Sequence, residues 1–152
     1  MQPSERLAEL QLVLPKVAAP VANYIPANRS GNLIFSSGQV PFKDGKVVYV
    51  GKVPTEVTLT QAADAARIAM LNAIAACAQI VGGVDAISRV VRVVVFVNSD
   101  PTFTEHPKVA NGASDLLVQI FGDQGRHARS ALGAAALPLN AAVEVELTVE
   151  VR

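Results

Sequence analysis

Two charged side chains near the end of the chain, Arg129 and Glu144, have the residue types and the spacing to do chemistry. They lie fifteen positions apart in the segment HARSALGAAALPLNAAVEVEL, residues 127–147, where small and apolar residues predominate. A guanidinium is always charged and carries five donors in a rigid fork, so a site that shelters it must contain or receive an anion. The segment therefore predicts a site for a small carboxylate ligand at Arg129.

Two strands are predicted to position this pair, at roughly 128–135 and 142–151, joined by a turn that contains proline. In the second strand, apolar residues alternate with polar ones, which places Glu144 off the core face. If the two strands form a hairpin symmetric about residues 136–137, Arg129 and Glu144 are cross-strand neighbours on one side of the sheet. Such a pair is also common as a purely structural ion pair, and sequence does not fix the register.

The other residues with reactive side chains do not form a second site in the sequence. The histidines, His106 and His127, have no neighbours at a metal-ligand spacing, so no metal is expected. His127 either lines the same cleft as Arg129 or is an exposed residue at the end of a strand. Cys77 falls on the apolar stripe of a predicted helix and is expected to be a small buried hydrophobic residue rather than a nucleophile.

Composition excludes several classes of function. Thirteen basic residues balance thirteen acidic ones, so there is no positive field to gather nucleic acid or an anionic membrane. No apolar run reaches the length of about 18 residues that a membrane helix needs. The single cysteine and the lack of a signal-peptide pattern favour a reducing compartment, the cytoplasm. With 51% hydrophobic and 17% charged residues, the chain is also expected to hide apolar surface in an oligomer.

Periodicity predicts the elements that hold the candidate site. Thr58 and Gln61 form a capping box at the start of a long helix that glycines 82–83 end, and a second helix tolerates Pro107 in its first turn and ends at Gly122. Gly112 is expected to weaken that second helix. Ser4 is the expected N-cap of a short first helix. The remaining predicted elements are strands at 32–40, 47–50 and 87–97, the first two joined as a hairpin by the KDGK turn and the last central and covered on both faces.

The element order predicted around the site is β-β-α-β-α-β-β. This order defines an α+β fold, a mixed sheet with two helices packed on one face. Length and composition predict a single domain over residues 1–152, with residues 1–20 as an N-terminal extension.

Three segments together carry a resemblance to a known family: YIPANRSGNLIFSSGQVP, VFVNSDPTF and ARSALGAAALPLNAAVEVEL. They resemble the reactive-intermediate (imine) deaminase family, whose members are also described as YjgF-like or L-PSP endoribonuclease-like. The resemblance runs roughly from Tyr24 to Arg152. It implies a chorismate-mutase-like fold, a homotrimer, and a ligand pocket in each cleft between neighbouring subunits.

The resemblance also implies an activity, the hydrolysis of 2-imino acids to 2-oxo acids and ammonia without a metal or cofactor. It places the carboxylate-binding arginine at Arg129 and the acidic residue that positions water at Glu144. The remaining pocket residues implied by the resemblance are Tyr24 at the mouth, Gly38, Asn111 and Ala131.

The sequence departs from the family pattern at three places. Ala131 stands where cysteine is frequent, His127 stands where many members carry proline, and the N-terminal extension is longer than in compact members. These departures indicate a divergent subgroup. A noncatalytic carboxylate-binding or protein-protecting module would use the same cleft without needing Glu144. Ribonuclease activity is disfavoured because the chain has no cluster of basic residues and no aromatic stacking stripe.

Overall fold

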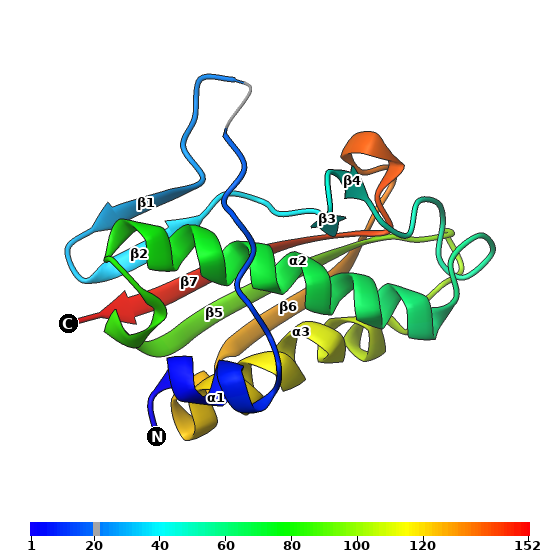
Figure 1. Ribbon diagram of the computed structural model, residues 1–152. Helices are drawn as coiled ribbons and strands as arrows, with labels where there is room; N and C mark the ends of the chain where they lie inside the picture. Colours follow the sequence, from blue (N-terminus) through cyan, green and yellow to red (C-terminus); the bar gives the residue numbers. More distant parts are fainter. Residues whose placement is uncertain (20–21) are drawn as a thin grey trace.

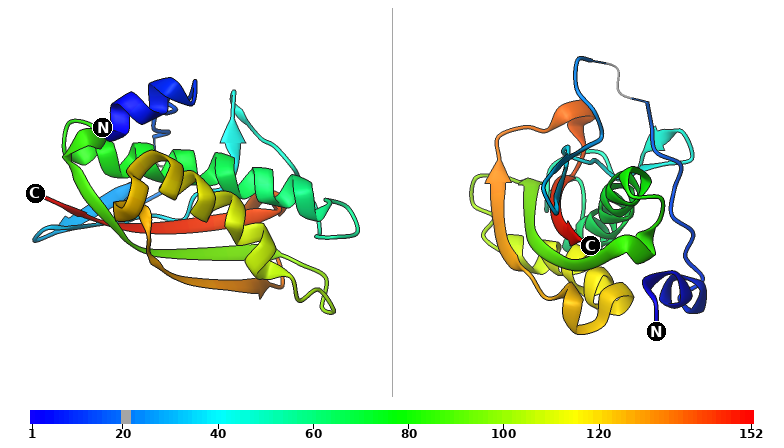
Figure 2. Two further views of the ribbon diagram at one scale, coloured as in Figure 1. Left: turned by 90° about the horizontal axis from the view of Figure 1, so that it is seen from below. Right: turned by 90° about the vertical axis from the view of Figure 1, so that its left-hand side faces the viewer.

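The computed structural model describes residues 1–19 and 22–152. Its core is a five-stranded sheet with helices along one side, so that the molecule has a helical layer and an uncovered sheet face (Figures 1 and 2). The sheet strands, in spatial order, are β1 (Ala27–Ser30), β2 (Leu33–Ser36), β7 (Val143–Val151), β5 (Ile87–Asn98) and β6 (Ala128–Ala134). The helices that cover one side of this sheet are α1 (Pro3–Glu9), α2 (Leu59–Ile80) and α3 (His106–Phe121). The mixed sheet and the helices on one face confirm the predicted α+β fold.

The predicted hairpin between the last two strands is wrong. β6 and β7 do not pair with each other, because β5 lies between them: β6 runs parallel to β5 and β7 runs antiparallel to it. The segment between β6 and β7 therefore crosses over β5 instead of making a tight turn. It contains a short 3₁₀ helix, Pro138–Asn140.

Strand β7 shows how the sheet separates its two faces. The residues that face the helices are buried, whereas Glu144, Glu146, Thr148 and Glu150 lie on the opposite face. On β5 the matching residues of that second face, which include Val94 and Phe96, are only partly buried. The prediction that β5 is covered on both faces is therefore wrong within one chain. We call this uncovered side of the sheet the open face.

Helix α2 begins as its sequence predicts. Thr58 Oγ1 accepts a hydrogen bond from the Gln61 backbone N–H at 3.1 Å, and the Gln61 side chain accepts one from the Thr58 N–H at 3.0 Å. These two bonds satisfy donors that would otherwise lack partners at the helix start. Of the apolar stripe predicted for this helix, Ala66, Met70, Ile74 and Cys77 are fully buried, whereas Ala63 and Val81 toward its ends are only partly buried.

Helix α3 packs against α2 through Gly112. A Cβ atom at this position would overlap the backbone carbonyl of Ala63 in α2, so the two helix backbones approach each other too closely for any side chain. The apolar stripe that helical spacing indicates for α3, formed by Val109, Ala113, Leu116 and Ile120, is fully buried. Glycine has a low intrinsic helix propensity, but at Gly112 it permits the close contact between α3 and α2.

We expect Gly112→Ala to lower the melting temperature by about 3–9 °C. Overpacking against a backbone atom costs about 1–3 kcal/mol after the small gain in helix propensity, and each kcal/mol shifts the midpoint of a chain this long by about 2–4 °C. Thermal unfolding followed by circular dichroism measures the shift, with Asp115→Ala at an exposed position of α3 as the control. A higher melting temperature for Gly112→Ala would show that helix propensity, and not the close contact with Ala63, determines the stability change at this position.

The N-terminal extension forms α1 and then crosses over the outside of α2 (Figure 1). The N-cap of α1 is Gln2, not Ser4 as predicted, because the helix already begins at Pro3 and Glu5 accepts a hydrogen bond from the Gln2 backbone N–H at 2.7 Å. Ser4 lies inside the first turn, where its backbone N–H and hydroxyl both donate to Asp85, at 2.8 and 2.6 Å. Leu7 is buried and Leu10 packs partly against the core. The last position assigned to the extension, residue 20, lies outside the described residues.

The first two predicted strands differ in the structure. Strand β2 is shorter than the predicted 32–40 element, and its partners are β1 and β7. The KDGK turn does form a hairpin, but between two very short strands, β3 (Phe42–Lys43) and β4 (Lys46–Val47). This hairpin stands apart from the main sheet (Figure 1).

Candidate functional site

Arg129 lies near the start of the edge strand β6 and points toward the helical layer. Its register partner on β5 is Val93, which is buried beneath the helices. The Arg129 Nη1 group donates to Asn111 Oδ1 at 2.9 Å and to Ser114 Oγ at 3.1 Å, both on α3. The guanidinium is therefore held between β6 and α3 by two hydrogen bonds.

The charge of Arg129 is not neutralised within the described chain. Both of its partners, Asn111 and Ser114, are neutral, and no carboxylate of residues 1–19 or 22–152 forms a salt bridge with it. The Nε and Nη2 groups, which form one edge of the guanidinium fork, make no hydrogen bond to the described residues. This free edge has the geometry that binds a carboxylate through two parallel hydrogen bonds.

Ser114 was not among the residues predicted from the sequence, yet it connects Arg129 to His127. The Ser114 Oγ lies 2.9 Å from His127 Nε2, and His127 Nδ1 lies 2.6 Å from the carbonyl oxygen of Gly125. His127 is partly buried by these contacts, so it is not simply an exposed residue at the end of a strand. The contact with α3 depends on tertiary packing, which no local pattern in the sequence signals.

Glu144 lies on the open face, beside Gly38. A Cβ atom at Gly38 would be only 2.8 Å from Glu144 Oε1, so the absence of a side chain at Gly38 leaves room for the carboxyl group. Partial burial, and secondarily the nearby negative charge of Glu146, raise the pKa of Glu144 above its ordinary value. A carboxyl group with a raised pKa is suited to exchange protons with a ligand.

Arg129 and Glu144 are not neighbours, which corrects the predicted cross-strand pairing. Their partners on β5 are Val93 and Phe96, and these two residues point to opposite faces of the sheet because their positions differ by an odd number. Arg129 therefore faces the helices, and Glu144 faces away from them. Within one chain the two groups do not form a single site.

The other predicted pocket residues divide in the same way. Asn111 contacts Arg129 directly, and Ala131 lies two residues along β6 from Arg129 on the same face. Gly38 lies with Glu144. Tyr24 precedes β1, and its side chain is 54% exposed with no hydrogen bond from its hydroxyl to a described residue. Asn111 and Ala131 thus accompany the arginine, whereas Gly38 accompanies the glutamate.

Cys77 is buried in α2, as predicted. Burial raises the pKa of its thiol to about 12, so the thiolate that would act as a nucleophile is not formed at neutral pH. Within residues 1–19 and 22–152, no group of three or more histidine, cysteine or acidic side chains is arranged to hold a metal ion. In the same residues, no helix is both long and apolar enough to cross a membrane.

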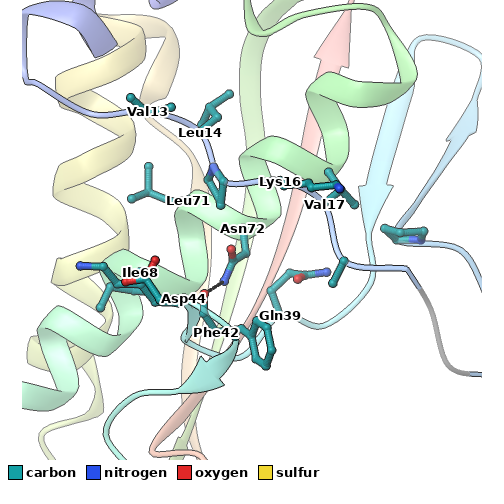
Figure 3. A pocket seen from close by; sticks show the side chains of 15 residues that line it. Val13, Leu14, Lys16, Val17, Gln39, Phe42, Asp44, Ile68, Leu71 and Asn72 are labelled. Atoms are coloured by element: carbon teal, nitrogen blue, oxygen red, sulfur yellow. Dashed lines mark hydrogen bonds between the residues drawn. The ribbon is translucent and has the colours of Figure 1, made fainter.

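A separate cavity of about 600 Å³ lies between the N-terminal extension and α2 (Figure 3). Leu14 and Val17 of the extension lie on one side of it, Leu71 and Asn72 of α2 on another, and Phe42 on a third. None of the predicted site residues lines this cavity. It is therefore separate from the position of Arg129 between β6 and α3.

Comparison with known proteins identifies the family. Residues 4–151 match the family described as "YjgF/chorismate_mutase-like, putative endoribonuclease". The chain belongs to this family, which confirms the resemblance found in the sequence. The α+β architecture described above, a mixed sheet with helices on one face, is the chorismate-mutase-like fold of this family.

Individual relatives match over nearly the whole chain. Protein TCP17 of Trypanosoma cruzi is 44% identical over 145 residues, which cover 95% of this chain and 91% of that protein. The crystal structure of a "putative endoribonuclease" from Shewanella oneidensis has a TM-score of 0.95 at 38% identity, and the match covers 99% of this chain and 100% of that chain. The protein Atu1372 of Agrobacterium tumefaciens, described as of unknown function, has a TM-score of 0.88 at 41% identity, with 98% and 91% covered.

Proposed function

We propose that the protein hydrolyses reactive 2-imino acids to 2-oxo acids and ammonia, in a cleft formed by two copies of the chain. The observation that carries this proposal is the free Nε–Nη2 edge of Arg129, a fixed positive charge that lacks an anionic partner among the described residues. A bidentate contact with the substrate carboxylate would neutralise this charge and orient the imine carbon.

The chemistry requires only one further group. A protonated imine is already electrophilic, so a water molecule positioned by Glu144 attacks the imine carbon while the carboxylate accepts a proton from that water. The resulting carbinolamine then transfers a proton to its amino group, the C–N bond breaks, and ammonia leaves the 2-oxo acid. The raised pKa of Glu144 makes its carboxylate a stronger base than an ordinary glutamate.

Two copies are required because Arg129 and Glu144 lie on opposite faces of one sheet. The open face that carries Glu144 also exposes large apolar side chains, including Phe35 at 44% and Leu132 at 41% exposed. An uncovered apolar sheet face of this kind favours association with another subunit. In the proposed homotrimer, each cleft combines Arg129 of one subunit with the Glu144 surface of its neighbour.

The test is a coupled assay in which an amino-acid oxidase generates 2-imino acids from several amino acids. The protein is expected to accelerate the formation of the 2-oxo acid, and Arg129→Ala is expected to abolish the acceleration. The alternative is a noncatalytic carboxylate-binding module, which would bind 2-oxo acids through Arg129 without accelerating loss of any imine. That result would overturn the enzymatic proposal.

Gly38→Ala provides a more local test of the role of Glu144. The new methyl group would displace the carboxylate, and a displacement of about 1 Å at a catalytic group lowers the turnover rate by about tenfold to 100-fold. Because the crowded atoms belong to a flexible side chain, we expect the melting temperature to change by less than about 2 °C. In a Glu144→Gln background the same substitution should cause no further loss. An equal loss of turnover rate in both backgrounds would show that Gly38 does not act through the Glu144 carboxylate.

A further inference from the structure

The hydrogen bonds behind Arg129 form a connected chain whose direction is set by its far end. His127 Nδ1 lies 2.6 Å from the carbonyl oxygen of Gly125. A carbonyl oxygen only accepts hydrogen bonds, so Nδ1 must carry a hydrogen. In the neutral imidazole, Nε2 is then an acceptor.

The middle of the chain follows from this tautomer. Ser114 Oγ lies 2.9 Å from His127 Nε2, so the single hydroxyl hydrogen of Ser114 is donated to the imidazole. Both lone pairs of Oγ remain available, and one of them accepts the hydrogen bond from Arg129 Nη1 at 3.1 Å. Since a hydroxyl that donates to one partner becomes a better acceptor for another, the bonds reinforce one another.

The result at Arg129 is a guanidinium with a defined orientation. One Nη1 hydrogen is held by Ser114 and the other by Asn111, so Nη1 has no donor left for a ligand. The Nε–Nη2 edge makes no hydrogen bond to any residue that the structure describes. Without an acceptor at Ser114, Nη1 would keep only one of its two partners, and the side chain would gain freedom to rotate.

We infer that His127 is a positioning residue that acts on the carboxylate site through Ser114. It fixes the Ser114 hydroxyl as an acceptor, and this acceptor fixes the guanidinium edge that meets the ligand. The inference rests on the proposed function in so far as the ligand is a carboxylate. The hydrogen-bond direction itself can be tested without any ligand.

The ligand-free test is nuclear magnetic resonance of the full chain with ¹⁵N-labelled histidine. Long-range proton–nitrogen correlations are expected to show His127 with a hydrogen on Nδ1 and none on Nε2 when the ring is neutral. The opposite tautomer would overturn the inference, because Nε2 would then donate to Ser114 and Gly125 would lose its donor.

The functional test is calorimetric binding of pyruvate, a 2-oxo acid. His127→Ala and Ser114→Ala are each expected to weaken binding by about fivefold to tenfold, the range expected for loss of one well-formed hydrogen bond. The double variant should bind no more weakly than Ser114→Ala, because both substitutions break one chain. His127→Gln, whose amide oxygen can replace Nε2 as an acceptor, should restore most of the affinity.

A matched control is available at the other end of α3. His106 Nε2 lies 3.2 Å from Ser99 Oγ, so His106→Ala also removes a serine–histidine contact but one that has no connection to Arg129. We expect pyruvate affinity to change by less than about twofold in this variant. Equal losses in His106→Ala and His127→Ala would overturn the positioning role.

The design separates failure of this inference from failure of the proposed function. If the natural chain does not bind pyruvate, or if Arg129→Ala binds it equally well, the carboxylate site itself is wrong. If Arg129→Ala abolishes binding but His127→Ala leaves it unchanged, the site stands and only the role of His127 is wrong.

Discussion

Replacing Arg129 with alanine is expected to lower kcat/KM for 2-imino acids by about 100-fold or more, because two charge-assisted hydrogen bonds to the substrate carboxylate are lost. Arg129→Lys keeps the positive charge but loses the planar fork, so we expect it to recover no more than about tenfold of the loss. Steady-state kinetics in the oxidase-coupled assay measure both effects.

The control for the arginine substitutions is Arg126→Ala. Arg126 is only three residues away in sequence, but its side chain is 76% exposed and its contact is a surface pair with Asp123. Its removal should leave kcat/KM within about twofold, since exposed ion pairs contribute little. If Arg126→Ala and Arg129→Ala had equal effects, the loss would reflect general positive charge and not a carboxylate site.

Glu144→Gln is expected to lower kcat by about 100-fold to 10,000-fold, the range attributed to a general base. Affinity for pyruvate should stay within about threefold, because the carboxylate contact belongs to Arg129 and not to Glu144. In the natural protein the rate should fall as pH falls through the raised pKa of Glu144, since only the ionised carboxylate accepts the proton. A Glu144→Gln protein with unchanged kcat would exclude this residue from the reaction.

The same substitution is expected to increase stability at neutral pH. Because the pKa of Glu144 is higher in the folded state, the folded protein retains a proton that the unfolded chain has lost. The free energy of unfolding therefore falls as pH rises through the window between the two pKa values. Glutamine does not ionise, so the Glu144→Gln protein avoids the cost of a partly buried charge. We expect its melting temperature to be higher than that of the natural protein by about 1–2 °C at neutral pH, a small shift because residue 144 is partly exposed. The difference should vanish below the ordinary pKa of glutamate.

Much of the fold could be predicted from the sequence because its signals are local. The capping box of Thr58 and Gln61, the glycine after α3 and the alternation in β7 each act within a few residues. The pairing of β6 and β7 could not be predicted in this way. Two strands joined by a turn look the same in sequence whether they pair directly or whether β5 lies between them.

Individual residues of the candidate site could be predicted from the sequence, but their arrangement in space could not. The resemblance implied roles for Arg129 and Glu144, and the alternation in β7 correctly placed Glu144 off the core face. Their relation to each other depends on the strand order, so the sequence suggested a pair within one chain where the structure has opposite faces. The Ser114 and His127 contacts depend on how α3 packs beside β6, which is set by close contacts such as that of Gly112.

Mixing two inactive proteins shows whether each site takes Arg129 from one copy and Glu144 from another. Arg129→Ala and Glu144→Gln chains are co-expressed in equal amounts, and the turnover of the mixed oligomers is compared with that of each variant alone. A working site needs an intact arginine from one chain and an intact glutamate from its neighbour, each present with a chance of about one half, so about one quarter of the natural activity should return. If both groups came from the same chain, no mixture would contain a complete site, and the absence of any recovered activity would show that the site is not shared between two copies.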